Sequence, residues 1–340
     1  MSQADVLFEA FEEARLRAPH LDCRTLAKLL DTSEGEIQAA RLGRGVHSLA
    51  LTPCDLVMML PRLGRIKMLT QTPHASMTSH LEQCQIDGNQ HHARLLDNNT
   101  LVMQLLLPCW YWVCLSQEQP DPHLSPVPCL QVFDRFGHVL HKLYALEPDQ
   151  RGWEVLKCYV ALKVPGFTRC IEATMSAAPA SPSALLREWH ALHTAEDFNR
   201  LLARHHIRRV AANRAVAGHF SEPIETGRFI IAMADACRQA QPTRVSLIHR
   251  GGTHHHRDRF EHFHQGRHYL LELESKTLSL CIDSSALHEA WRVERPGPQG
   301  LTTSLEAFDA RGRLMAAMDI ADTHPVQERR KRPLARPEGA

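Results

Sequence analysis

The sequence predicts an α+β protein formed by tandem duplication of one module, in which a few short helices precede a large antiparallel sheet. The main observation is a repeat: residues 130–137 (LQVFDRFG) return as residues 305–312 (LEAFDARG), so that Phe133 aligns with Phe308, 175 residues later. Two more pairs keep nearly this offset, Thr100-Leu101 with Thr277-Leu278 and 26–40 with 198–212. A unit of this size is a domain, because solenoid repeats span roughly 20 to 50 residues.

The predicted elements follow the same order in both halves, helices first and strands afterwards. Residues 24–30 have apolar side chains at helical spacing, and Ser33 with Glu36 has the form of a capping box that opens a second short helix. From Ile66 the pattern changes to β-rich runs, and we expect strands at 100–107, 110–115, 129–133 and 139–146, with a hairpin turn at 133–137. In the second half we expect a helix over 185–202 and strands at 245–248, 269–273, 278–282, 290–293 and 303–308.

The boundaries of the modules are placed by composition. Residues 1–173 form the first module, and 174–184, which are rich in Ala, Ser and Pro, form the linker. Residues 185–324 form the second module. Residues 325–340 carry a basic run and are expected to be a disordered tail.

Composition argues against several classes of protein. With 340 residues and 44% hydrophobic content, each half can bury a core, and a net charge of +1 is too balanced for a nucleic-acid surface. No apolar stretch approaches the roughly 18 residues of a membrane span, and the first residues carry acids rather than a basic leader, so we expect no membrane insertion and a cytoplasmic location. The ten cysteines form no Cys-x-x-Cys pair, which indicates reduced thiols rather than a zinc ribbon.

A set of landmarks in fixed order resembles the bacterial HemS/HmuS/ChuS family of hemin transport and hemin-degrading proteins. They include Arg24-Thr25-Leu26-Ala27, Trp110, Phe133-Asp134, Glu188-Trp189, Glu289-Ala290-Trp291 and Phe308-Asp309. The resemblance implies two tandem α+β modules and haem, iron protoporphyrin IX, as the cofactor. It implies a cytoplasmic role in haem and iron utilisation, as hemin trafficking and as oxidative haem degradation that releases iron. The implied partners are a haem importer, a haem oxygenase or an electron donor.

The family's axial histidine lies seven residues after a tryptophan, and counting from Trp189 leads to Glu196. Since imidazole is a better iron donor than carboxylate, His193, one helical turn earlier, becomes the candidate iron ligand. Arg209 aligns with an arginine that the family places near a haem propionate. On the strand around residues 251–256, alternation places His254 and His256 on one face and His255 on the other, and the resemblance puts His256 in the pocket.

Other functions stay open at this point. The substituted ligand favours a haem carrier or iron-homeostasis adaptor without turnover as the alternative to an enzyme. Histidines on neighbouring strands are also compatible with a zinc, nickel or copper site, or with a solvated hairpin that holds no metal. They are His249, His254, His255, His256, His262, His264 and His268. After the last Phe-Asp turn, the residues 315–320 (MAAMDI) replace the family's polar anchors with two methionines that are candidates for packing against a porphyrin.

Overall fold

The computed structural model describes residues 2–19, 21–119, 125–169, 178–297 and 300–320. In the first half the helices are α1 (Gln3–Arg17), α2 (Cys23–Leu29), α3 (Glu34–Ala40), α4 (Pro53–Met59) and α5 (Arg151–Lys157). The strands are β1 (Val46–Leu49), β2 (Ile66–Thr72), β3 (Ala75–Leu81), β4 (Cys84–Gly88), β5 (His92–Asp97), β6 (Thr100–Leu106), β7 (Trp112–Glu118), β8 (Val127–Phe133), β9 (Val139–Ala145) and β10 (Val160–Ala161).

The second half repeats this order. Its helices are α6 (Pro182–His190), α7 (Ala195–Arg204), α8 (Arg209–Ala215) and α9 (Thr226–Gln239). Its strands are β11 (Ser221–Ile224), β12 (Thr243–His249), β13 (Gly252–Asp258), β14 (His262–Gln265), β15 (Leu270–Glu274), β16 (Leu278–Asp283), β17 (Leu287–Gly297), β18 (Gly300–Asp309) and β19 (Leu314–Ile320). Short 3₁₀ turns lie at Leu60–Leu63, Leu107–Cys109, Arg267–Tyr269 and Ser284–Ala286.

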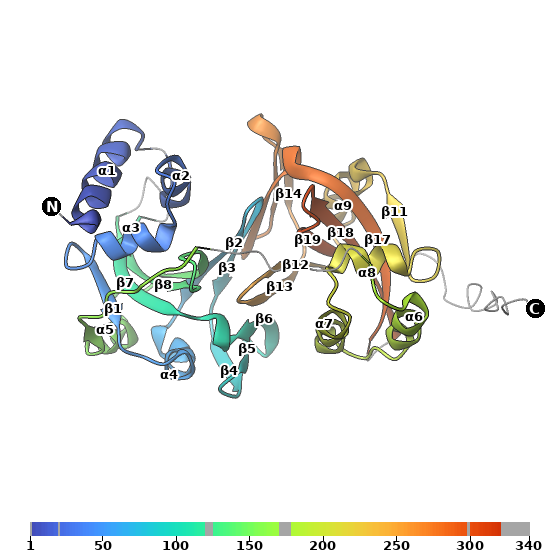
Figure 1. Ribbon diagram of the computed structural model, residues 1–340, viewed down its shortest axis with the longest axis horizontal. Helices are drawn as coiled ribbons and strands as arrows, with labels where there is room; N and C mark the ends of the chain where they lie inside the picture. The colour runs from blue at the N-terminus through green and yellow to red at the C-terminus, as the bar shows by residue number, and fades with distance from the viewer. Residues whose placement is uncertain (1, 20, 120–124, 170–177, 298–299, 321–340) are drawn as a thin grey trace, which may run out of the picture.

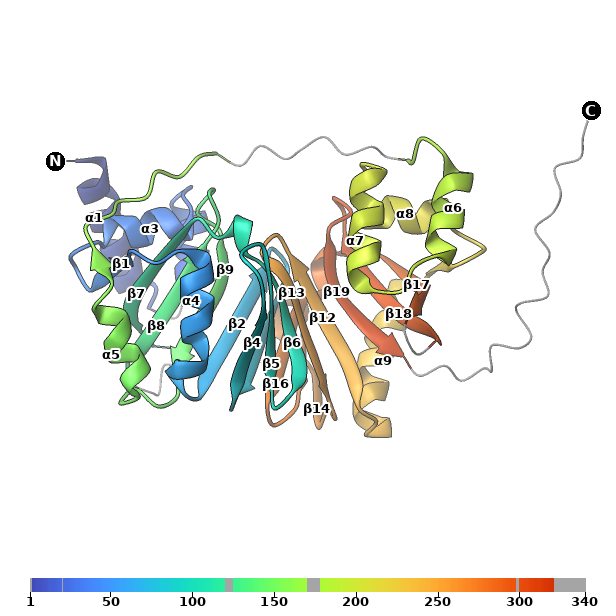
Figure 2. The ribbon, with the colours of Figure 1, turned by 90° about the horizontal axis from the view of Figure 1, so that it is seen from below.

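The strands form two large antiparallel sheets, which confirms the predicted α+β class. Sheet A has the order β10-β1-β7-β8-β9-β2-β3-β16-β15-β14, and sheet B has the order β11-β17-β18-β19-β12-β13-β6-β5-β4. Apart from β10, each strand of one sheet has its counterpart at the same place in the other. Each half therefore gives three of its strands, β4–β6 or β14–β16, to the sheet of the other half, and the two sheets meet in the middle of the molecule (Figures 1 and 2). The predicted module boundaries remain a prediction, since the sheets contain strands from both halves.

The repeated Phe-Asp turn is built in the same way in both halves. Asp134 accepts hydrogen bonds from the backbone N–H groups of Phe136 and His138. Asp309 accepts them from the backbone N–H groups of Arg311 and Arg313. Gly137 and Gly312, with φ of 79° and 70°, close the turns in the left-handed region that favours glycine. The hairpin predicted at 133–137 is thus present, and its repeat at 308–312 is built in the same way.

The helices cover opposite faces of the sheets. The face of sheet B that carries Trp291 and Phe308 packs against α6, α7 and α8, in a core that contains Trp189 and Phe198. The opposite face packs against α9 and against strands β15 and β16 of sheet A. In Figure 2 the three helices α6–α8 stand over one end of sheet B, while α9 lies on its other side.

One predicted element is wrong: residues 185–202 are not a single helix. The chain leaves α6 after His190 and begins α7 at Ala195. Thr194 caps α7, because its side chain accepts from the backbone N–H of Asp197 while Asp197 accepts from the backbone N–H of Thr194. Helix α6 also begins at Pro182, within the predicted linker. The rest of the linker up to residue 177 and the predicted basic tail lie outside the described residues.

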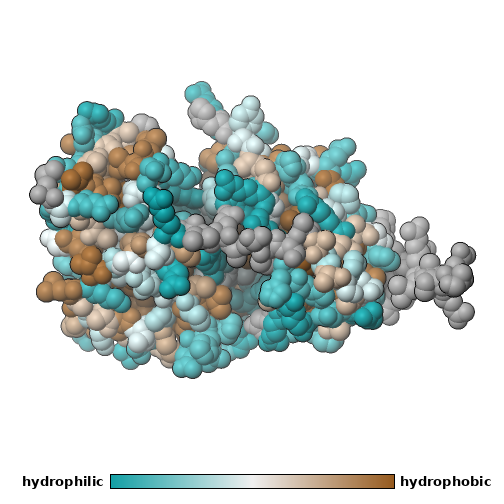
Figure 3. Space-filling model, in the orientation of Figure 1, coloured by the Kyte–Doolittle hydropathy of each residue, from teal (hydrophilic) through white to brown (hydrophobic). Residues whose placement is uncertain are grey.

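The surface mixes polar and apolar regions (Figure 3). Exposed apolar side chains near α5 and the edge strand β10 include Tyr159, Val160 and Leu162. Within the described ranges, no helix is long and apolar enough to cross a membrane.

Candidate functional site

A row of polar side chains runs across the face of sheet B that carries α6–α8. His255 of β13 pairs with Ser246 of β12, Ser246 pairs with Ala317 of β19, and Ala317 pairs with Glu306 of β18. Directly paired residues share a face in a pleated sheet, so these side chains point the same way. The Nδ1 atom of His255 lies 2.8 Å from Oγ of Ser246.

Glu306 is the buried centre of an ionic cluster at one end of this row. Its side chain is 0% exposed, and one carboxylate oxygen accepts from Nη1 of Arg209 at 2.6 Å and forms an ion pair with Arg295. The other oxygen accepts from Nδ2 of Asn213 at 2.8 Å. The guanidinium groups of Arg209 and Arg295 also lie 4.8 Å and 4.3 Å from the ring centre of Phe198 in α7. The cluster therefore ties α7 and α8 to the sheet.

This cluster carries an excess of positive charge. Two guanidinium groups share one carboxylate, and they hold the pKa of Glu306 at about 2 although burial acts in the opposite direction. Burial lowers the pKa of Arg209 to about 10, because the carboxylate of Glu306, which Arg209 shares with Arg295, does not compensate for the lost hydration of the guanidinium group. The Nε group of Arg295 is buried and has no hydrogen-bond partner among the described residues. An anionic group of a ligand would therefore be favoured at this point of the sheet.

Further charged side chains extend the cluster across the sheet. Arg244 lies 3.6 Å from Asp319, and Arg257 pairs with Arg244 across β12 and β13 on the same face. Burial raises the pKa of Asp319, while the neighbouring guanidinium groups of Arg244 and Arg295 act in the opposite direction. We call this surface, formed by Arg209, Arg244, Arg257, Arg295 and His255, the basic face.

The candidate iron ligand His193 lies between α6 and α7 rather than on a helix. It is exposed, and its backbone N–H donates to Oδ2 of Asp197 at 3.2 Å. The prediction that His193 and Glu196 lie one turn apart on one helix is therefore wrong, since α6 ends at His190 and α7 begins only at Ala195. Glu196 belongs to the first turn of α7, but its side chain lies outside the described part of the molecule. His193 is thus close in sequence to Phe198, which contacts the basic face.

The structure separates His254 and His256 from Arg209. The predicted alternation is present, but His254 and His256 point to the contact between the sheets and His255 points to the basic face. His254 is fully buried, with Nδ1 3.0 Å from Oγ1 of Thr70 and Nε2 2.9 Å from Oγ of Ser79. Since both ring nitrogens are engaged, this placement argues against His254 as a haem contact. The roles of these residues toward haem stay predictions.

The remaining predictions concern metals and the methionine segment. Among the side chains that the structure describes, no group of three or more His, Cys, Asp or Glu residues is arranged to hold a metal ion. The side chain of His268 is not among them. Met315 and Met318 are 1% exposed and belong to the core on the α9 side of sheet B. They are therefore not available to pack against a porphyrin.

Comparison with known proteins gives the family. A family model described as the haemin-degrading HemS.ChuX domain matches residues 206–327. The hemin transport protein HmuS of Yersinia pestis is 24% identical over 338 residues, covering 97% of this chain and 96% of that protein. The hemin transport protein HemS of Yersinia enterocolitica is 25% identical, covering 92% and 91%. The chain is a divergent member of the HemS family.

Solved structures support the same assignment. Holo-PhuS, a heme-binding protein from Pseudomonas aeruginosa, matches with a TM-score of 0.82 and 26% identity, covering 94% of both chains. The heme degrading enzyme ChuS of Escherichia coli O157:H7 matches with a TM-score of 0.85 and 20% identity, covering 95% of this chain and 96% of that chain. At that identity the second match shows the fold alone. The two-sheet architecture of this HemS-family chain is thus shared with known proteins over nearly its whole length.

The residues of the basic face fit part of what a haem requires. The two guanidinium groups around Glu306 leave a positive charge for a propionate, and the Nε group of Arg295 is a free donor. The exposed imidazole of His193 is free of hydrogen bonds from its ring among the described residues and suits iron. Arg295 was not identified from the sequence, and His255 was identified only as a member of the histidine cluster. The period-two alternation did place His255 on the other face of its strand from His254 and His256. It could not show whether this is the face of sheet B that α7 covers.

Proposed function

We propose that this HemS-family protein binds haem on the basic face of sheet B beside α7 and serves in haem and iron utilisation. The observation that carries the proposal is the buried carboxylate of Glu306 between two arginines, which leaves an uncompensated positive charge where α7 meets the sheet. Relatives described as hemin transport proteins and as a heme-binding protein cover nearly the whole chain. Together, charge and kinship favour an anionic, iron-containing macrocycle as the ligand.

In this proposal the chain's own residues hold the haem at three points. His193, just before α7, would supply the imidazole for the iron, and its exposure leaves the ring free to turn toward a ligand. Arg209 and Arg295 attract the propionates while Glu306 and Phe198 hold their guanidinium groups in place. His255, fixed by Ser246, lies along the same row of the sheet. Haem itself supplies the redox-active iron when it is bound.

Two roles remain within haem utilisation. The first is transport with oxidative degradation of haem that releases iron, and the second is binding and transfer without turnover. The second is favoured by Glu196 at the family's ligand position. It is also favoured by the exposed ring of His193, which makes no hydrogen bond to the described residues, since catalytic imidazoles are usually oriented by a second hydrogen bond. We further propose a cytoplasmic location, because the nine described cysteines are free thiols. A haem importer, a haem oxygenase or an electron donor would then be the partner.

A hemin titration followed by absorption spectroscopy tests the proposal. We expect a saturable, shifted Soret band for the wild type and a band that is weakened and blue-shifted for His193→Ala. His190→Ala is the matched control. It removes an exposed imidazole that lies three residues before His193 and contacts the ring of Phe220. The absence of any saturable Soret change in the wild type would refute haem binding, and equal spectra for His193→Ala and wild type would refute the ligand.

Addition of ascorbate or a reductase in air separates the two roles. Bleaching of the Soret band with release of iron would indicate an enzyme that degrades haem. A stable spectrum, followed by transfer of the band to apomyoglobin, would indicate a carrier. The same measurement with His193→Ala shows whether the imidazole is needed for turnover or only for binding.

A further inference from the structure

A continuous chain of hydrogen bonds crosses the contact between the two sheets, on the side of sheet B opposite the basic face. It begins at His141 in β9 of sheet A and ends at Asp258 in β13 of sheet B. Between these ends it uses side chains from three further strands or turns. In order, its members are His141, Thr70, His254, Ser79, His256, Thr277 and Asp258.

The inner part of the chain is completely buried. The Nδ1 atom of His141 lies 3.4 Å from Oγ1 of Thr70, which lies 3.0 Å from Nδ1 of His254. The Nε2 atom of His254 lies 2.9 Å from Oγ of Ser79. All four side chains belong to residues that are 0% exposed. Water therefore has no direct access to these imidazoles.

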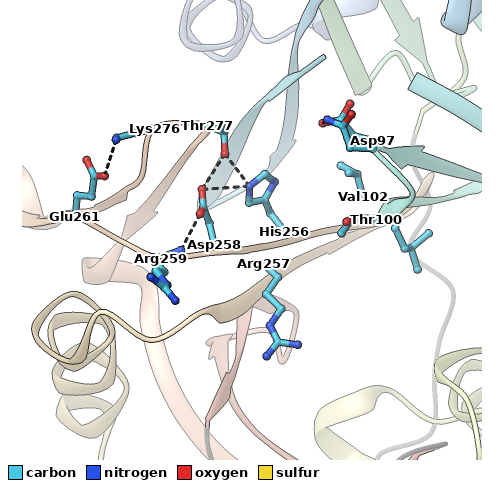
Figure 4. A pocket seen from close by; sticks show the side chains of 12 residues that line it. Asp97, Thr100, Val102, His256, Arg257, Asp258, Arg259, Glu261, Lys276 and Thr277 are labelled. Carbon is cyan, nitrogen blue, oxygen red and sulfur yellow. Dashed lines mark hydrogen bonds and ion pairs between the residues drawn. The ribbon is translucent and has the colours of Figure 1, made fainter. Parts of the chain in front are cut away.

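The outer part of the chain leads to a cavity. The Oγ atom of Ser79 lies 3.3 Å from Nδ1 of His256, and Nε2 of His256 lies 3.1 Å from Oγ1 of Thr277. The hydroxyl of Thr277 donates to Oδ2 of Asp258 at 2.8 Å. These last three residues line a cavity of about 460 Å³. Figure 4 shows their side chains directed toward one another, whereas Arg257, between His256 and Asp258, points to the other side of the strand.

The position of every proton in the chain follows from its last member. Hydrogen bonds from Ser275 and Thr277 lower the pKa of Asp258 against the effect of burial, so this carboxylate only accepts. Burial lowers the pKa of His141, His254 and His256, so each ring is neutral at pH 7 and has one donor and one acceptor. Thr277 donates to Asp258, so it must accept from Nε2 of His256, and Nδ1 of His256 must accept from Ser79. Ser79 must then accept from Nε2 of His254, whose Nδ1 accepts from Thr70, and Thr70 accepts from Nδ1 of His141.

This assignment leaves Nε2 of His141, at the inner end of the chain, as an acceptor without a donor among the described residues. Nδ1 of His141 donates to Thr70, so Nε2 of His141 carries no proton, and that atom is buried without a partner. The ring of His249 lies 4.8 Å away, and its Nδ1 accepts from the backbone N–H of Gly251, which places its proton on an unpartnered Nε2. The ring of Trp110 lies 5.7 Å away with an unpartnered Nε1–H. Within the described part of the chain, the inner end thus combines one acceptor and two donors that have no partner.

We propose that this chain of side chains is a proton relay between the buried surroundings of His141 and the cavity at Asp258. A proton that binds to Nε2 of His141 releases the proton on Nδ1 to Thr70. Each hydroxyl and imidazole along the chain then gives up one proton and gains another, and Asp258 receives the last one. Afterwards the three histidines hold the opposite tautomer, and the same path carries a proton inward. This relay does not depend on haem binding.

The charges around the outer end suit an exchange with solvent. Asp97, Arg259, Glu261 and Lys276 line the same cavity, and Asp97 and Asp258 both favour a proton on His256. At the inner end, His249 and His254 oppose a second charge on His141. A second proton is therefore more favourable on His256, at the outer end of the chain, than on the buried ring of His141.

Exchange of the imidazole protons with water tests the relay. In protein labelled with ¹⁵N-histidine, NMR should show the proton of His254 and of His256 on Nε2 and that of His141 on Nδ1. We expect the Nε2 proton of His254 to exchange with solvent at least ten times faster than the slowest backbone amides of β13. Thr277→Val should slow this exchange at least tenfold, and Thr277→Ser should restore it.

Thr72→Val is the matched control, because Thr72 is a buried threonine of β2 whose hydroxyl donates to the carbonyl of Ala75 outside the chain. Its exchange rates should equal those of the wild type. The relay is overturned if the proton of His254 lies on Nδ1, if it exchanges only as fast as the slowest amides, or if Thr277→Val leaves its rate unchanged. The tautomers are measured in the wild type, so this part of the test survives if a variant fails to fold.

Discussion

Replacement of Glu306 by glutamine should destabilise the protein strongly, because it leaves two buried guanidinium groups without a counter-charge. The pKa of Glu306 falls from an ordinary 4.5 to about 2 in the folded protein. A difference of this size corresponds to about 3 kcal/mol of folding free energy at pH 7. This free energy is not reduced for screening by solvent, because the side chain of Glu306 is 0% exposed. Loss of one partner from a buried ion pair typically costs about 3–5 kcal/mol, which agrees with this magnitude.

The stabilisation should depend on pH in a defined window. A carboxylate with a lowered folded pKa stabilises the protein above its unfolded pKa of 4.5 and loses this effect as the pH falls toward 2. Urea denaturation at pH 7 should therefore show a loss of about 3 kcal/mol for Glu306→Gln. The difference from the wild type should shrink between pH 4.5 and 2.

The matched control is Glu222→Gln, which removes a carboxylate from the same sheet. Glu222 lies 3.4 Å from Arg292 and is 52% exposed, so the change should cost less than about 1 kcal/mol. A loss below about 1 kcal/mol for Glu306→Gln, or a loss that does not change with pH, would refute the view that this carboxylate neutralises the two arginines.

Three further outcomes are expected. Gly312→Ala should lower the free energy of unfolding by more than about 1 kcal/mol, whereas Gly43→Ala should cost less, and thermal melts of both variants test this. Both glycines have a positive φ, but an added Cβ would lie 2.7 Å from Cγ1 of Val210 at position 312 and would meet no atom within 4 Å at position 43. Stability should fall as the pH drops from 6.5 to 4, since burial lowers the pKa of His249 and His255 to about 4 and the unfolded rings bind protons first; a flat free energy of unfolding over this window would contradict it. Thr194→Ala should cost about 1 kcal/mol through the lost cap of α7, seen as a lower urea midpoint, and an unchanged midpoint would show that α7 does not need it.

Much of the fold was predictable because the duplicated segment carries its own turn chemistry. The Phe-Asp turn needs an aspartate to accept backbone N–H groups and a glycine with positive φ, and both recur at the same spacing. The exchange of β4–β6 and β14–β16 between sheets was not predictable, because strand pairing across halves depends on tertiary packing and leaves no local signal. The helix break at Ala191–Thr194 was missed, although Thr194 and Asp197 have the form of a cap.

The candidate site was only partly predictable. Arg209 was identified, but its partner Glu306 was not, since a buried carboxylate has no pattern that separates it from an exposed one. The histidine-rich strand gave the alternation of residues 254–256 but not the face that α7 covers. The strand pairing places His255 on the same face as Glu306, and the packing of Phe198 against Arg209 and Arg295 shows that α7 covers this face.

The reciprocal exchange of three strands makes the two halves mutually dependent for folding. Without β14–β16, strand β3 would present an open hydrogen-bonding edge, and without β4–β6 the same would hold for β13. Thermal or chemical denaturation should therefore proceed in a single transition rather than half by half. A first half produced alone could satisfy its edge by accepting β4–β6 from a second copy, which would rebuild the two-sheet arrangement as a symmetric dimer. Gene duplication would then have joined into one chain what two identical chains had assembled.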